Sequence, residues 1–169
     1  KAIAYLRNDG GRYRKADRPF ALVVAMNPPH TPYDQVPQRY VDRYADKTDA
    51  QLMARKSVVP GSKGEQHNKK WIRDYFACIT GVDEQFGRIL KALDELGLHD
   101  DTVVLFTSDH GNCLGAHDEV TKNVPFEESM RVPMLVRWPG HIAPRRDDLL
   151  LSTVDLAPTL LDLLGFGGD

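Results

Sequence analysis

Apolar residues along the chain fall into short continuous runs separated by long polar stretches. Each run is rich in β-branched or aromatic residues and ends in polar or turn-forming residues, which is typical of strands buried on both faces of a sheet. The runs of this kind are FALVVAM at 20–26, TVVLFT at 102–107 and PMLVR at 133–137. The pattern therefore predicts three buried strands.

Two other stretches repeat apolar residues at the three- and four-residue spacing of an amphipathic helix. Residues 69–96 keep this spacing throughout, and they are followed by Gly97, a residue type that commonly ends helices. Residues 156–164 form a shorter stretch of the same kind, with Asp155 as the predicted N-cap and Gly165 as the end. The pattern predicts one long helix and one short C-terminal helix.

Strands that alternate with helices predict an α/β fold with a mainly parallel sheet flanked by helices. In such sheets ligands bind outside the carboxyl ends of the strands. Polar motifs occupy two of these positions, NPPH at 27–30 and SDHG at 108–111. Residues 1–19 are polar and contain glycine, so we interpret them as a loop or insertion. Residues 61–64 (GSKG) are too short for a phosphate-binding loop, and we interpret them as a mobile loop.

Composition narrows the function only slightly. Among 169 residues, 22 basic and 24 acidic side chains give a net charge of -2, which favours neither a nucleic acid nor an anionic membrane as a partner. The two cysteines, Cys78 and Cys113, are too few for a disulfide scaffold or a Cys-rich zinc site. No apolar run approaches the roughly 18 residues that a membrane span needs, so we predict none.

Five polar residues near the predicted strand ends are candidates for chemistry. Asp109 and His110 follow a buried strand and offer a carboxylate oxygen and an imidazole nitrogen to a cation. His30 lies among prolines that stiffen its backbone, and a fixed histidine can donate to an anion or protonate a leaving group. Lys122 and His117 follow the SDHG motif, where an ammonium group can hold an anionic oxygen. For each residue taken alone, a structural or solvated role is an equal or stronger interpretation.

In combination, these motifs resemble the sulfatase family of the alkaline phosphatase-like superfamily. Four short blocks occur in the family's order and cover about residues 20–165, which makes the signal specific. The resemblance implies that 20–169 form the C-terminal portion of a sulfatase catalytic domain, and thus part of that fold. The blocks are FALVVAMNPPHTPY, GRILKALDELGLHDDTVVLFTSDHGN, LGAHDEVTKNVPFEESMRVPMLVRWPG and LSTVDLAPTLLDLLG.

The resemblance also implies a role for each candidate residue. Asp109 and His110 match two metal ligands of the family, whose metal is usually Ca²⁺ and sometimes Mg²⁺. Lys122 matches a lysine that contacts the sulfate group, and His30 matches a histidine that binds the sulfate or assists the leaving group. Both are therefore catalytic and substrate-binding candidates, and His117 is a weaker substrate-binding candidate. Substrates within the family include small-molecule and carbohydrate sulfate esters.

The nucleophile of the family is missing from these residues. Sulfatases carry a formylglycine made from the first residue of a Cys/Ser-x-Pro-Ser-Arg motif, and neither Cys78 nor Cys113 begins such a motif. The resemblance places this motif, together with an Asp-Asp metal-binding pair, in an N-terminal portion outside the chain. We therefore predict that the parent enzyme hydrolyses sulfate esters and that the 169 residues alone do not. We also predict that the isolated residues self-associate through an exposed strand edge.

Two alternatives stay open at this point. A phosphodiesterase or phosphonate monoester hydrolase of the same superfamily would share the Asp-His turn, although the EES-x-RVP and RWPG segments favour a sulfatase. A non-catalytic α/β binding module would use Asp109 and His110 only structurally. The family slightly favours a periplasmic or secreted location, and a cytoplasmic location is also open.

Overall fold

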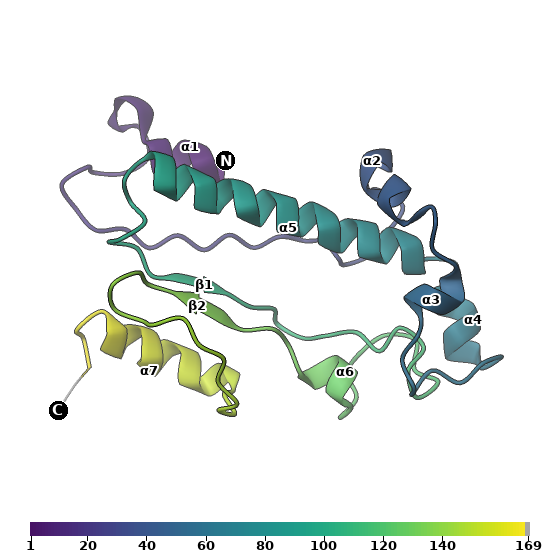
Figure 1. The fold of residues 1–169 in the computed structure, drawn as a ribbon. Helices are drawn as coiled ribbons and strands as arrows, with labels where there is room; N and C mark the ends of the chain where they lie inside the picture. The colour runs from purple at the N-terminus through teal and green to yellow at the C-terminus, as the bar shows by residue number, and fades with distance from the viewer. Residues whose placement is uncertain (168–169) are drawn as a thin grey trace.

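An elongated molecule is built along one long helix (Figure 1), and the computed structural model describes residues 1–167. Helix α5 (Ile72–Glu95) runs along most of its length. A two-stranded sheet lies beside the C-terminal half of α5, and three short helices gather at its N-terminal end. The remaining elements are α1 (Ala2–Arg7), η1 (Asp9–Gly11), α2 (Gln38–Val41), η2 (Asp42–Tyr44), α3 (Asp49–Leu52), α4 (Lys63–Lys69), β1 (Val104–Phe106), α6 (Glu127–Met130), β2 (Leu135–Arg137) and α7 (Thr153–Leu163).

Helix α5 confirms the long helix predicted from apolar spacing, with ends within three residues of the predicted ones. Its C-terminus ends as Gly97 predicts: this glycine has a left-handed φ of 65°. The Leu98 N–H donates to the Leu93 carbonyl at 2.9 Å, and the Gly97 N–H donates to the Asp94 carbonyl at 3.1 Å. These two bonds satisfy carbonyls that the last turn of a helix leaves unpaired.

The main apolar cluster joins this end of α5 to helix α1. Leu6 of α1 is buried against Ala92 and Leu93 of α5, and Val104 of β1 packs on the same cluster. The expectation that residues 1–19 form a polar loop is therefore wrong for their first part. An aliphatic residue on one side of the short helix docks on α5, and this long-range contact stabilises a helix that is too short to be stable by itself.

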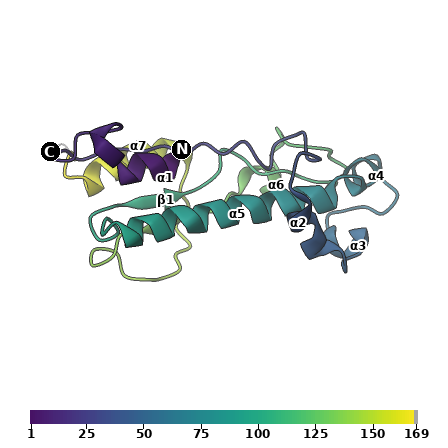
Figure 2. The same ribbon diagram turned by 90° about the horizontal axis from the view of Figure 1, so that it is seen from above.

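The sheet differs from the predicted one in direction and in size. Strands β1 and β2 confirm the second and third predicted strands, but they pair antiparallel, with Leu105 opposite Val136. The expected mainly parallel sheet is therefore wrong for residues 1–167. Residues 20–26 run alongside α5, and the view from above shows them to one side of α5 and β1 (Figure 2). The first predicted buried strand is wrong, because within residues 1–167 no strand pairs with this run and Val23 is 91% exposed. An apolar run predicts burial, whereas a strand also needs a neighbour that accepts its backbone hydrogen bonds.

Helix α7 confirms the predicted C-terminal helix with a different cap. Ser152, rather than Asp155, is the N-cap, and the Asp155 carboxylate accepts from the Ser152 N–H at 2.7 Å. Several apolar side chains of this region are exposed, including Leu150 and Val154. In the described part of the chain, no helix combines the length and apolar character that crossing a membrane requires. A domain boundary at residue 19 stays a prediction.

Candidate functional site

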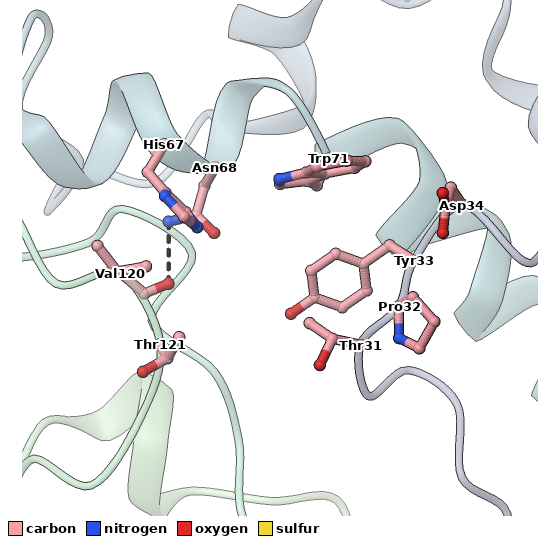
Figure 3. Close-up of a pocket in the computed structure, with 9 residues that line it drawn as sticks. All are labelled: Thr31, Pro32, Tyr33, Asp34, His67, Asn68, Trp71, Val120 and Thr121. Atoms are coloured by element: carbon pink, nitrogen blue, oxygen red, sulfur yellow. Dashed lines mark hydrogen bonds between the residues drawn. The ribbon is translucent and has the colours of Figure 1, made fainter.

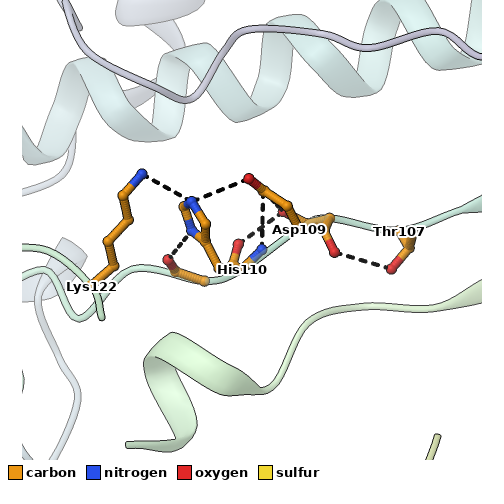
Figure 4. A network of polar contacts seen from close by, with 6 residues as sticks. Thr107, Asp109, His110 and Lys122 are labelled. Carbon is orange, nitrogen blue, oxygen red and sulfur yellow. Dashed lines mark hydrogen bonds and ion pairs between the residues drawn. The ribbon is translucent and has the colours of Figure 1, made fainter. Parts of the chain in front are cut away.

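The SDHG turn follows β1 and turns its polar atoms toward one another (Figure 4). The His110 N–H donates to Asp109 Oδ1 at 3.0 Å, and the Ser108 hydroxyl donates to the His110 carbonyl at 2.9 Å. Loss of hydration in the turn raises the pKa of Asp109, but the hydrogen bonds from the His110 N–H and the Ser108 hydroxyl help to outweigh it, so the net pKa is lowered. An ionised carboxylate is the form that binds a cation.

The hydrogen bonds of His110 determine its tautomer. Ring Nδ1 lies 2.8 Å from the Gly111 carbonyl, and since a carbonyl only accepts, Nδ1 carries the proton. Nε2 is then an unprotonated acceptor, and the Lys122 ammonium donates to it at 2.9 Å. Metal-binding histidines commonly donate one ring nitrogen to a carbonyl and use the other as the ligand; here the second nitrogen, Nε2, accepts from Lys122.

A divalent cation fits the atoms that face each other here. Asp109 Oδ2 lies 3.2 Å from His110 Nε2 with no proton between them, so two electron-rich atoms point to one place. A positive charge relieves their repulsion, and the Lys122 ammonium supplies one beside Nε2. Within residues 1–167 no third His, Cys, Asp or Glu completes a metal cluster. The chain thus brings together Asp109, His110 and Lys122, and the metal role of Asp109 and His110 stays a prediction.

His30 lies on a neighbouring loop and is exposed. Its Nδ1 donates to the Thr31 carbonyl at 2.9 Å, which leaves Nε2 as the free acceptor. Across residues 1–167, no hydrogen bond or ion pair joins His30 to Asp109, His110 or Lys122. The loops themselves meet nearby, because the Asn112 amide lies 3.5 Å from the Tyr33 hydroxyl.

His117 belongs to a second polar network. Its Nε2 lies 3.2 Å from Glu128 Oε2, its ring stacks on Phe126, and the Ser57 hydroxyl donates to Glu128 Oε1 at 2.6 Å. The Ser57 hydrogen bond is the main reason why the pKa of Glu128 is lowered. The structure therefore ties His117 to Glu128 and does not place it in direct contact with Lys122.

Helix α4 holds the loop that carries Lys122, and sequence reasoning missed it. The buried Asn68 amide donates at 2.9 Å to the carbonyls of both Gly64 and Val120. The Gly64 N–H donates to Asp118 Oδ1 at 2.6 Å, and a Cβ on Gly64 would lie 2.6 Å from the Asp118 carbonyl carbon. The interpretation of 61–64 as a mobile loop is therefore wrong.

A capping signal for α4 was present in the sequence. Ser62 and Glu65 have the spacing of a capping box, and the Ser62 hydroxyl accepts from the Glu65 N–H at 3.2 Å. This signal predicts a helix start at residue 63. It does not predict the partners of α4, because Val120 lies 52 residues further along the chain than Asn68.

Neither cysteine fits the formylglycine nucleophile. Cys78 lies in the middle of α5 and Cys113 follows the SDHG turn, and both are buried free thiols. Burial is the main reason why the pKa of each thiol is raised. A buried, protonated thiol is unreactive, so no step of a reaction can be assigned to either residue.

A cavity of 310 Å³ opens between the loop that follows His30 and the loop that precedes Lys122 (Figure 3). Aromatic side chains form one wall, and helix α4 and the loop before Lys122 form the opposite side. Its lining consists of Thr31, Pro32, Tyr33, Asp34, His67, Asn68, Trp71, Val120 and Thr121.

Comparison with known proteins identifies one family. The family model described as Sulfatase matches residues 1–166. The chain is 44% identical over 171 residues to an endo-4-O-sulfatase of Bacteroides thetaiotaomicron, covering 99% of the chain and 33% of the relative. It is 38% identical to a ulvan-active sulfatase of Formosa agariphila, covering 88% of the chain and 29% of that relative. The chain thus spans about a third of the length of the curated relatives it matches.

A solved structure supports the same assignment. A Bacteroides thetaiotaomicron protein, from work on the metabolism of multiple glycosaminoglycans, superposes with a TM-score of 0.90 at 44% identity. The match covers 98% of the chain and 34% of that protein. The α/β fold class and the partial alkaline phosphatase-like fold are therefore confirmed, although the strand pair in this part is antiparallel.

Proposed function

The chain belongs to the sulfatase family, and from this premise we propose that the complete protein hydrolyses sulfate esters of carbohydrates. The observation that carries the proposal is the contact between Asp109, His110 and Lys122 at the end of β1. Matched relatives bear sulfatase names, including sulfatases named for ulvan and for N-acetylglucosamine. These names favour a sulfatase over a phosphodiesterase, a phosphonate hydrolase or a binding module, and they favour a sugar ester over other small-molecule esters.

Each candidate residue has a role that its geometry supports. We propose that Asp109 and His110 hold a divalent cation, with Ca²⁺ expected from the family. When bound, the cation supplies positive charge that offsets the charge on the sulfate oxygens. The Lys122 ammonium, which donates to His110 Nε2 in this structure, would leave that nitrogen to the cation and donate to a sulfate oxygen, where charge develops in the transition state. His30 can donate from Nε2 only as an imidazolium, with both ring nitrogens protonated, and in that form it binds an ester oxygen or serves the leaving group as an acid; His117 binds the substrate further out.

These residues supply only part of the machinery. The sulfatase family uses a formylglycine, and no residue of this chain fits it. We propose that other residues of the complete protein provide the nucleophile and the remaining cation ligands. The 169 residues alone are then expected to release no sulfate, and they are expected to self-associate, which sedimentation of the purified chain would test.

The test measures sulfate release from sulfated sugars by the purified complete protein. Replacing Lys122 with Ala removes a donor to the developing charge and should lower kcat by roughly 100-fold or more. Lys91→Ala is the matched control, because Lys91 is an exposed residue of α5 and should keep full activity. Asp109→Asn should lower the bound-metal content, measured by elemental analysis. Sulfate release that is unaffected by both Lys122→Ala and Asp109→Asn would contradict the proposed roles.

A further inference from the structure

The cavity beside the candidate site has one aromatic wall. Tyr33 and Trp71 pack with ring centroids 6.4 Å apart at a tilt of 53°, and Tyr75 supports Tyr33 from behind at 5.6 Å. Tyr33 is buried and Trp71 is half-buried, so one part of the indole faces the opening. Flat aromatic surfaces supported in this way suit the apolar faces of a ring-shaped ligand.

The rest of the cavity is polar and includes a donor without a partner. Figure 3 shows the Trp71 ring nitrogen turned toward the open space, and within residues 1–167 it makes no hydrogen bond. The indole nitrogen of Trp138, by contrast, donates to the Asp100 carbonyl at 3.2 Å. The exposed Asp34 and His67 stand on opposite sides of the opening. An aromatic wall with hydrogen-bonding groups around it matches a sugar ring, which carries C–H faces and a hydroxyl edge.

The position of the cavity relates it to the sulfate-binding candidates. Thr31 on one side directly follows His30, and Thr121 on the other side directly precedes Lys122. The cavity is therefore bordered by the two loops that carry His30 and Lys122, although neither of these residues lines it. A volume of 310 Å³ is at the small end for ligand sites, which suits a single sugar ring better than a long stretch of polysaccharide.

We propose that this cavity binds the sugar ring that carries the sulfate ester, with Trp71 as the stacking platform and His67 as a contact at its edge. The inference rests on the proposed function and adds a site for the leaving-group side of the substrate. Trp71 binds the ring in the ground state and the transition state alike, so its loss should raise KM more than it lowers kcat.

The experiment uses the complete protein and the sulfated sugar that it hydrolyses fastest among sulfated hexosamines and galactose sulfates. Trp71→Ala should raise KM for this ester about tenfold, the ratio expected when a stacking contact is removed. Inhibition by inorganic sulfate should stay unchanged, because sulfate alone does not occupy the cavity. Trp138→Ala is the matched control, since Trp138 stacks on His141 outside the cavity, and it should leave KM unchanged.

A second variant and a binding measurement guard against loss of folding. His67→Ala replaces an exposed residue in α4 with a good helix former, so the fold is kept, and KM should rise severalfold. The unsulfated sugar should also quench part of the tryptophan fluorescence of the complete protein, and this quenching should be lost in Trp71→Ala and kept in Trp138→Phe. Normal KM in both cavity variants, or no quenching, would overturn the sugar site while sulfate release continues. If no sulfated sugar is hydrolysed at all, the proposed function itself has failed.

Discussion

The two ends of the long helix α5 are held by different forces. At its C-terminal end, a buried apolar cluster is formed by Leu6, Ala92 and Leu93, and the N–H groups of Gly97 and Leu98 cap the helix. Beyond its N-terminal end, Asn68 of α4 holds the loop that precedes Lys122 through hydrogen bonds between residues far apart in the sequence. The first end has the periodic pattern of a core, and the second has the irregular backbone of a binding site.

Apolar packing is present near the candidate site as well, through the buried Ile72, Cys113 and Ala116, so the two ends differ mainly in their backbone. The loop around the candidate site has left-handed φ at five positions, and specific polar contacts add to apolar burial in maintaining this backbone. Those positions are Leu114, Gly115, His117, Asp118 and Asn123. Strained backbone persists only where the surroundings enforce it, so changes here should affect function before global stability.

The largest combined effect on stability and activity is expected from Gly111→Ala in the SDHG turn. A Cβ at this position would overlap the carbonyl oxygen of Glu128, and the Gly111 N–H donates to the Ser129 carbonyl at 2.7 Å. The two backbones must separate, which should lower the free energy of unfolding by about 3 kcal/mol. A displacement of about 1 Å at His110 can lower kcat roughly 100-fold. Denaturant unfolding and sulfate release of the complete protein measure the two effects.

Gly87→Ala is the matched substitution in the regular helix α5. Gly87 lies inside α5, and a Cβ there meets nothing within 4 Å. Alanine favours the helix by up to about 1 kcal/mol, so this variant should be slightly more stable and fully active. Equal effects of the two substitutions would remove the proposed difference between the regions.

Leu93→Ala tests the apolar end. Leu93 is 3% exposed within the cluster, and its truncation should leave a cavity that costs about 2–5 kcal/mol of unfolding free energy. Leu96→Ala, at a position that is 38% exposed, should cost clearly less. The folded Leu93→Ala protein should keep its kcat, because its cluster includes no residue of the SDHG turn. A fall in kcat without loss of folded protein would show that the two ends are coupled.

Asn68→Ala tests the polar end. The variant leaves two carbonyls without their buried donor, which should cost about 1–3 kcal/mol. It should also weaken inhibition by inorganic sulfate, because Val120 is no longer held and Lys122 lies two residues beyond it. Gln66→Ala removes an exposed amide that bonds the Gly61 carbonyl from the same helix, and it should change neither property. Unchanged sulfate inhibition in Asn68→Ala would show that α4 does not position Lys122.

Sequence reasoning predicted the apolar end better than the polar end for a physical reason. Periodicity records which side of a helix is buried, so α5 and its Gly97 terminus could be predicted closely. The pairing direction of β1 and the missing strand partner of 20–26 could not be predicted in this way, because the residues that pair with a strand can lie far from it in the sequence. The same limit applies to helix α1 at 2–7, whose docking on α5 depends on residues more than 80 positions away.

For the candidate site, local motifs placed some residues and missed others. Asp109 and His110 are adjacent in sequence, and Lys122 does contact His110, as their common assignment to one site requires. Asn68 was missed as a support, and the partner Ser57 of Glu128 was not predicted, because these contacts join residues 50 or more positions apart. A local sequence motif does not show such long-range contacts. The roles of Asp109, His110 and Lys122 in binding stay proposals.

The smallest expected effect is a pH dependence of the polar end that depends on Glu128. The Ser57 hydroxyl, and to a lesser extent His117, hold the pKa of this carboxyl below its usual value in the folded protein. A group with a depressed folded pKa stabilises the fold above its unfolded pKa, about 4.3 for Glu, and loses that contribution as the pH falls through the folded pKa. Glu128→Gln should therefore flatten the acid side of the stability profile.

Denaturant midpoints measured from pH 3 to pH 7 test this expectation. The wild type should lose stability below about pH 4.3 more steeply than Glu128→Gln, and the two curves should be parallel above about pH 6. Glu127→Gln is the control, because Glu127 is exposed and its pair with Arg131 spans 3.5 Å at the surface, where such pairs contribute little. Parallel curves for the wild type and Glu128→Gln throughout would mean that the Ser57–Glu128–His117 network does not contribute to the stability of the polar end.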